Sequence, residues 1–374
     1  MSTVLPPNLP DDIDLAPGTE LGGSARSRVS RHRVNQAPAQ WGSSVVVKTF
    51  LAPEGGSPDE ADAGAGPHTE GFLRERAGLR YLPGTPALLA EDAPNTTLVM
   101  EDIGAAPTLA DLLVGDDPGA AWTACLRWAR ALGGHVMADP YVLQQFRADL
   151  GPAEETNRRL MAALPDAGLD AMADWGVRHA EAARAEVSEA FTALLGDSTR
   201  EVISAGDTCP DNAVLTERAV RFLDTEGTAV HPVAIDAAYA LQPFSSCWCV
   251  FTPPSGLREA MLAEFTAGAS RQLPQLATDP HWPAQVRAAV VIFTVVSAAW
   301  LLPSARTKVA SIGPAGALAP NHRQLLVSRW RQVIAEAADD FPDTAAAADE
   351  AITRALREWG GNGALDLPGY PAWR

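Results

Sequence analysis

Three polar side chains that could hold a metal ion and take up a proton lie within a short part of the sequence. Asp207 and Asn212 are separated by four residues, and two apolar segments joined by a polar turn then lead to Asp224. If these segments pair as a hairpin, the amide and the second acid come close together, and both are oxygen ligands that suit Mg²⁺. Asp207 could then face a hydroxyl group. A second interpretation stays open, in which Asp, Pro and Asn only make the local hydrogen bonds of a turn.

A lysine and a glutamate nearer the N-terminus could form a buried ion pair. Lys48 ends an apolar strand pattern and is one of only two lysines beside 27 arginines, which indicates a role that needs a compact ammonium group. In the helical pattern that follows, Glu75 shares one stripe with Phe72, Leu79 and Leu82. A carboxylate in an apolar stripe needs a cation beside it, and the lysine is the candidate. The alternative is a glutamate at the edge of the stripe that reaches the solvent.

Small residues precede the first strand pattern of this region. Gly22 and Gly23 sit where two strands would turn, and glycines there let backbone N–H groups approach a phosphate. Ser24 or Ser27 could add a hydroxyl donor. Any pair of glycines in a turn looks alike, so the position one strand before the lysine gives this pattern its meaning.

The elements that must position these residues divide the chain into two parts. Residues 1–100 begin with an extended lead-in over 1–20 and then carry strand patterns and one helix. Residues 101–104 form a hinge, and residues 105–374 are mainly helical. In the first part we expect strands over 28–34, 44–50, 87–90 and 97–100, and a helix from Thr69 to about Leu82.

The second part alternates helical patterns with one β-rich interlude at 201–235. Apolar residues recur with helical spacing on both sides of that interlude. We expect helices over 119–137, 154–164, 169–195, 256–273, 283–302, 321–339 and 344–359. A cleft between a β-rich lobe and a helical lobe is a favoured place for a ligand.

Taken in order, these motifs resemble a known family, the aminoglycoside phosphotransferase-type kinases. The resemblance spans residues 18–360, and the spacing Asp-x-x-x-x-Asn is that of a kinase catalytic loop. The segments that carry it are Gly22-Gly23-Ser24, Val-Val-Val-Lys48, Arg-Glu75-Arg-Ala-Gly-Leu, Leu-Val-Met-Glu101-Asp-Ile-Gly, Gly-Asp207-Thr-Cys-Pro-Asp-Asn212 and Phe-Leu-Asp224-Thr-Glu. The resemblance implies an α+β, bilobal, protein-kinase-like fold with a β-rich N-terminal lobe and a mainly helical C-terminal lobe.

The same resemblance implies roles for the residues of the catalytic and nucleotide sites. Asp207 would be the catalytic base, and Asn212 and Asp224 would be ligands of Mg²⁺. Lys48 would bind the phosphates of ATP, oriented by Glu75.

The resemblance also implies how adenine is held. The hinge that begins at Met100 would bind it through the backbone carbonyl of Glu101 and the N–H of Ile103.

One position departs from the family, because Ala205 stands where a histidine usually precedes the catalytic aspartate. The missing activation segment and the helical insertion at 142–199 resemble the small-molecule branch.

Composition excludes several other classes. A net charge of −17 repels phosphates, so we expect no binding to nucleic acid and none to anionic membranes. The four cysteines are too few for a disulfide framework, and Cys247-Trp-Cys249 is half of a zinc pattern, for which we expect a buried apolar role. The N-terminus shows no secretory signal, and the uncharged apolar stretch 288–302 is shorter than the about 20 residues of a membrane span. We therefore expect a cytoplasmic protein.

The leading functional expectation is an enzyme that moves the γ-phosphoryl group of ATP, with Mg²⁺, to a hydroxyl of a small molecule. Residues 1–50 carry a net charge of +1 and the remainder −18, which favours a cationic acceptor such as an antibiotic or natural product. Two alternatives stay open: a peptide Ser/Thr kinase of natural-product maturation, and a nucleotide-binding pseudokinase, the latter because of Ala205. The sequence does not indicate an oligomeric state.

Overall fold

The strand β5 (Ser44–Phe50) shows how the sequence builds the N-terminal sheet. Successive side chains of a strand point to opposite faces. Val47 is buried in an apolar cluster on one face. Lys48 and Phe50 point to the other face, where Phe50 packs edge-on against Phe72 with ring centroids 6.3 Å apart.

The N-terminal sheet is antiparallel and follows the order β1-β3-β4-β5-β7-β6, with β2 paired to β4. This is seen in a computed structural model, which describes residues 3–4, 9, 12–23, 26–52, 67–242, 244–245, 247–309, 311–313 and 316–374. The other strands of the sheet are β1 (Thr3–Val4), β2 (Asp14–Leu15), β3 (Gly18–Gly23), β4 (Ser27–Gln36), β6 (Leu88–Asp92) and β7 (Thr97–Glu101).

One helix, α2 (Pro67–Tyr81), packs on the face of the sheet that carries Lys48. Its apolar stripe places Phe72 and Leu79 in a cluster with residues of the sheet. Gly78 lets the helix approach the segment that follows the hairpin of residues 213–222, because a Cβ there would collide with Thr225. The helix therefore joins the sheet to the neighbourhood of Asp224.

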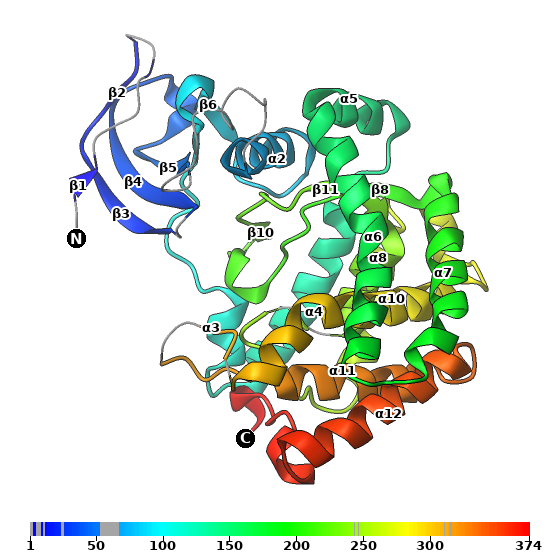
Figure 1. Ribbon diagram of the computed structural model, residues 1–374. Helices are drawn as coiled ribbons and strands as arrows, with labels where there is room; N and C mark the ends of the chain where they lie inside the picture. Colours follow the sequence, from blue (N-terminus) through cyan, green and yellow to red (C-terminus); the bar gives the residue numbers. More distant parts are fainter. Residues whose placement is uncertain are drawn as a thin grey trace.

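The helical lobe follows the hinge and starts at α3 (Leu109–Leu113), which Thr108 and Asp111 cap reciprocally. The longer helices are α4 (Pro118–His135), α5 (Pro140–Leu150), α6 (Pro152–Asp174), α7 (Ala180–Gly196), α8 (Val233–Leu241), α9 (Leu257–Ala269), α10 (Trp282–Thr307), α11 (His322–Ala337) and α12 (Pro342–Trp359). Two antiparallel strand pairs lie among them, β8 (Glu201–Ser204) with β11 (Ala229–Pro232) and β9 (Ala213–Leu215) with β10 (Val220–Phe222). Figure 1 shows the sheet and α2 on one side of the molecule and the helices on the other. The α+β fold class with a β-rich and a helical lobe is thus confirmed.

Helices α4 and α9 of the helical lobe pack closely against each other. Helices α4 and α9 approach through Gly133 and Gly268, where a Cβ would collide with the backbone of the opposite helix.

Helix α10 is long and apolar enough to cross a membrane, but 67% of its most apolar window is buried inside the protein. It packs against α6, α7, α8 and α11, as the central helix of a large core does.

The helix boundaries between residues 140 and 196 differ from those expected. Proline in a helix interior removes a hydrogen bond, and we expected one helix to end at Leu164, before Pro165. Instead α6 continues through Pro165, which is buried. Gly168 lies so close to Val295 of α10 that a Cβ would collide with its carbonyl oxygen, so tertiary packing outweighs the proline. Helix α6 ends at Asp174, and Gly176 follows with a φ of 91°.

Candidate active site

A cavity of about 330 Å³ lies where the sheet, α2, the hinge and the β9–β10 hairpin meet. Eighteen residues from these elements line it: Leu21, Gly22, Gly23, Val29, Arg31, Val46, Lys48, Glu75, Pro86, Met100, Glu101, Asp102, Ile103, Gly104, Asn212, Val214, Leu223 and Asp224. The structure therefore brings nine of the twelve predicted site residues to one cavity. Of the other three, Ser27 and Asp207 are not among the lining residues, and Ser24 lies outside the described residues.

Lys48 is the electrostatic centre of this cavity. Its Nζ lies 3.1 Å from Glu75 Oε2, 2.9 Å from Asp224 Oδ1 and 3.8 Å from Glu226 Oε2. The pKa of Lys48 is raised, because these carboxylates outweigh the burial that by itself would lower it. Three acids thus share one ammonium group. Burial raises the pKa of Glu75 to about 7, although the positive charge of Lys48 by itself would lower it. The predicted Lys48–Glu75 ion pair is confirmed.

Asn212 and Asp224 are held together by the hairpin between them. Strands β9 and β10 pair, and the N–H of Leu223 donates to the carbonyl of Asn212 at 2.7 Å. Asp224 follows at once, with a left-handed φ of 20°, a strained conformation for a residue with a side chain. The side chain of Asp224 is 34% exposed, whereas that of Glu75 is 1% exposed. An amide and an accessible carboxylate thus face the same cavity.

Asp207 lies in the loop that follows β8. Gly206 turns the chain with a φ of 75°, and a Cβ at this position would collide with the carbonyl of Gly227. The Asp207 carboxylate accepts a hydrogen bond from the N–H of Cys209 at 3.3 Å. Burial is the main cause that raises the pKa of Asp207. A carboxylate with a raised pKa is a better proton acceptor.

A polar network formed by Ser204, Asp236 and His231 adjoins the start of this loop. Ala205 itself is fully buried among apolar side chains. The preceding residue, Ser204, donates through its hydroxyl to Asp236 Oδ1 at 2.8 Å, and His231 Nε2 lies 3.1 Å from Asp236 Oδ2. Burial alone would lower the pKa of His231, but the neighbouring Asp236 raises it. Ser204 also accepts a weak bond from the N–H of Gly206 at 3.4 Å.

These three network residues were absent from the sequence-based site. One signal was present, because Asp236 stands in the otherwise apolar segment Ala-Ile-Asp-Ala-Ala-Tyr-Ala of α8, where a buried carboxylate requires partners. Ser204 and His231 carry no such signal. Their strands β8 and β11 pair only in the folded chain.

The hinge is fixed by arginines from two different elements. Arg221 on β10 donates to Glu101 Oε2 at 2.7 Å and to the carbonyl of Thr85 at 2.7 Å. The hydrogen bond from Arg221 to the Glu101 carboxylate is the main cause that lowers the pKa of Glu101. Arg31 and Ser44 hold the carboxylate of Asp102 at 2.9 Å and 2.7 Å. The side chains of Glu101 and Asp102, which follow Met100, are thus held by hydrogen bonds within the protein.

The glycine turn lies at the mouth of the cavity. Gly22 and Gly23 have φ angles of 152° and 149°, and a Cβ at Gly23 would collide with the carbonyl oxygen of Ser27. This close approach requires glycine at position 23. Ser27 is itself buried, opposite Phe50 in the β4–β5 register.

Cysteines connect the loop that contains Asp207 to the segment after α8. Cys247 and Cys249 are buried, and their sulfur atoms lie 3.3 Å apart. Cys209, Cys247 and Asp211 each bring one ligand atom to within 4.8 Å of the others. Trp248 Nε1 donates to Asp211 Oδ2 at 2.9 Å. Residues 209–212 are thus in direct contact with residues 247–249.

No protein-family model matches the chain, and no curated protein matches it. Several solved structures are similar over most of its length. A choline kinase from Cryptosporidium parvum Iowa II is 11% identical, with a TM-score of 0.47 over 92% of this chain and 94% of that one. A choline/ethanolamine kinase family protein from Mesorhizobium loti is 13% identical, with a TM-score of 0.48 over 90% of this chain and 93% of that one.

An aminoglycoside phosphotransferase bound to ADP is 13% identical, with a TM-score of 0.40 over 79% of this chain and 88% of that one. At these identities and TM-scores, the chain's own residues must carry any assignment of function. The chain is similar in structure to choline kinases and to aminoglycoside phosphotransferases, the group that its motifs resemble.

Proposed function

We propose that this protein is an ATP- and Mg²⁺-dependent phosphotransferase that phosphorylates a hydroxyl group of a small molecule. The observation that carries the proposal is the arrangement around Lys48. A buried ammonium held by Glu75 lies in one cavity with an accessible carboxylate, an amide, a glycine turn and a hinge. This is the set of groups that positions and stabilises a transferring phosphoryl group.

Lys48 and Glu75 would bind and orient the nucleotide phosphates. Glu75 is buried and keeps its contact with Lys48, whereas the second partner, Asp224, is accessible to a ligand. When Asp224 turns to a cation, the Lys48 ammonium can donate to phosphate oxygens while Glu75 still holds it. Gly22 and Gly23 line the same cavity, and their backbone N–H groups would cover the phosphates.

Asn212 and Asp224 fit a magnesium ion. Both supply oxygen atoms, both line the cavity, and the hairpin hydrogen bond fixes their separation. Mg²⁺ is commonly held by one or two protein oxygens and completed by phosphates and water. When bound, the ion would neutralise charge on the phosphates.

Asp207 would accept the proton of the acceptor hydroxyl as its oxygen bonds to the γ-phosphorus and the bond from that phosphorus to ADP breaks. Burial favours this role, because it raises the proton affinity of the carboxylate. Ser204, which Asp236 and His231 hold in one network, accepts a bond from the N–H of Gly206 and would in this way help to orient the loop that bears Asp207. That orientation favours turnover over a nucleotide-binding protein without activity.

The acceptor would be a small hydroxylated molecule. The net charge of −18 on residues 51–374 favours a cationic acceptor through long-range attraction.

The proposal is tested first by ATP binding and then by turnover. We expect ATP with Mg²⁺ to raise the melting temperature of the wild type, and Lys48→Met to abolish the shift. ATP consumption is then measured against a panel of hydroxylated cationic, neutral and anionic compounds. Lys308→Met, which changes the other lysine, is the matched control. A nucleotide shift that is equal in Lys48→Met and wild type contradicts the proposal.

A further inference from the structure

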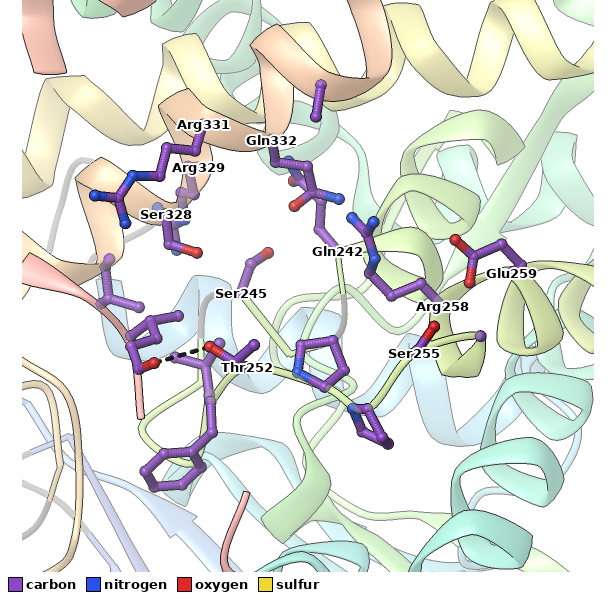
Figure 2. A pocket seen from close by; sticks show the side chains of 18 residues that line it. Gln242, Ser245, Thr252, Ser255, Arg258, Glu259, Ser328, Arg329, Arg331 and Gln332 are labelled. Carbon is purple, nitrogen blue, oxygen red and sulfur yellow. Dashed lines mark hydrogen bonds between the residues drawn. The ribbon is translucent and has the colours of Figure 1, made fainter. Parts of the chain in front are cut away.

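A second cavity, of about 380 Å³, lies in the helical lobe between α9, α11 and the segment that joins α8 to α9. Figure 2 shows polar side chains from all three elements around it. Its lining includes Gln242, Ser245, Arg258, Arg329 and Arg331. It shares no lining residue with the nucleotide cavity.

Arg329 distinguishes this cavity from an ordinary surface groove. It is 3% exposed, and among the described residues its Nε and Nη1 atoms have no hydrogen-bond partner. Its guanidinium lies over the ring of Phe293, 5.3 Å from the centroid. The other two arginines of the cavity are already paired, Arg258 with Glu336 at 2.9 Å and Arg331 with Asp366 at 2.5 Å.

A buried guanidinium with two nitrogen atoms that lack hydrogen-bond partners is costly to fold. Burial lowers the pKa of Arg329 to about 10, so the group still carries its charge at neutral pH. A buried charge is normally paired and hydrogen-bonded. Arg329 therefore calls for an anion that the described residues do not supply.

Two further buried groups beside the cavity lack partners. Among the described residues, the Ser245 hydroxyl and Gln242 Oε1 form no hydrogen bond, although both residues are buried. The Gln242 amide is already oriented, because its Nε2 donates to Thr294 at 3.3 Å. Ser245 can donate to an anion, whereas Gln242 Oε1 can only accept. Buried polar groups are rarely left unsatisfied.

We propose that this cavity is a second ligand site, for a small organic anion that also carries a hydrogen-bond donor. A carboxylate or phosphate of the ligand would pair with Arg329 and Ser245, and a hydroxyl or ammonium group would donate to Gln242 Oε1. The site goes beyond the phosphotransferase function and does not depend on it.

The cavity is connected to the catalytic loop by one short segment. The N–H of Cys247 donates to the carbonyl of Phe244 at 2.8 Å, next to Ser245. Trp248, one residue further on, donates to Asp211 of the loop at 2.9 Å. A ligand that holds Ser245 would thus also restrain the segment that contacts the loop.

The test uses inorganic phosphate and citrate as probes, with sodium chloride at matched ionic strength as the reference. At least one of them should raise the melting temperature of the wild-type protein in a saturable way. A response to phosphate alone identifies phosphate chemistry, and a response to citrate alone identifies carboxylate chemistry. A response to neither contradicts the proposal.

Variants locate the binding. Arg329→Gln should weaken binding at least tenfold, and without a probe it should melt no lower than the wild type because it loses an unpaired buried charge. Ser245→Ala removes one hydroxyl and should also weaken binding, which keeps the test decisive if Arg329→Gln fails to fold. Arg287→Gln is the control, because Arg287 pairs with Asp340 outside this cavity. A response that both cavity variants retain, or that Lys48→Met alone abolishes, overturns the proposal.

Discussion

The Lys48 ammonium and the Glu75 carboxylate lie 3.1 Å apart and are both almost fully buried, although 27 positions separate them in the chain. Lys48 is the cation that pairs with the Glu75 carboxylate, and Asp224 and Glu226 share the same ammonium group. The contact joins the central strand of the sheet to α2 and leaves the accessible side of Lys48 directed at Asp224. It therefore contributes to both the stability of the lobe and the shape of the nucleotide site.

Removal of either charge should reveal this double role. Lys48→Ala leaves Glu75 without its cation, and breaking a buried pair in this way costs about 3–5 kcal/mol. Lys48→Ala with Glu75→Gln should recover much of that stability but none of the activity. Chemical denaturation of the single and double variants measures the coupling, with Lys308→Ala as the control. Additive losses would show that the two side chains act independently.

Stability should depend on pH through Glu75. Burial raises the pKa of Glu75 to about 7 from its ordinary value of 4.5, so the folded protein holds this proton more tightly than the unfolded chain. The contribution is complete below pH 4.5 and is lost as the pH rises through 7. In Glu75→Gln the unfolding free energy should lack this decline between pH 4.5 and 7. Glu189→Gln, at an exposed position of α7, should keep it, and an identical profile for Glu75→Gln and wild type would refute the assignment.

Asp207→Asn should slow phosphoryl transfer without weakening nucleotide binding. The asparagine keeps the shape of the side chain but cannot take up the proton, and a general base typically contributes about 10²–10⁴-fold. Steady-state kinetics and ATP titrations measure the two effects separately. Asp174→Asn changes an exposed aspartate at the end of α6 and serves as the control. A variant that turns over at the wild-type rate would remove Asp207 from the mechanism.

Ser204 should act as a positioning residue for the catalytic loop. Ser204→Ala removes the hydroxyl that donates to Asp236, and we expect kcat to fall about tenfold, which corresponds to about 1.4 kcal/mol. KM for ATP should not change, because Ser204 lies outside the nucleotide cavity. Ser204→Thr keeps the hydroxyl and should restore kcat. Equal losses in the alanine and threonine variants would indicate a packing defect.

Salt should separate the acceptor from the nucleotide. Long-range attraction of a cation fades as the Debye length falls from about 10 Å at 0.1 M salt to about 3 Å at 1 M. For a cationic acceptor, kcat/KM should therefore decrease with added salt more steeply than the affinity for MgATP does. The measurement needs only the acceptor found in the screen. A neutral or anionic acceptor with a rate that ignores salt would exclude the electrostatic explanation.

The sequence was informative wherever one residue conflicted with its own local pattern. Glu75 in an apolar stripe and Lys48 at the end of an apolar strand predicted a contact that the structure confirms. The α+β class followed from the change of periodicity after residue 100. Features that depend on two distant segments were missed, such as Arg221 reaching Glu101 and Ser204 reaching Asp236.

Local rules also failed where packing outweighed them. We expected a helix to end at Leu164, but α6 continues through Pro165, and its Gly168 packs closely against α10. Ser27 was proposed as a candidate hydroxyl donor of the phosphate turn because this turn lies one strand before Lys48. The β4–β5 register buries it opposite Phe50 instead.

The scarcity of lysine has a practical consequence for work with this protein. Lys48 is 5% exposed and bound by acids, whereas Lys308 is exposed just after α10. An amine-acylating reagent should therefore modify the side chain of Lys308 and spare Lys48 in the folded protein. A fluorophore or a surface linkage can thus be attached to one known side chain without mutagenesis. Acylation of Lys48, followed by peptide mapping, would then serve as a reporter for opening of the nucleotide lobe.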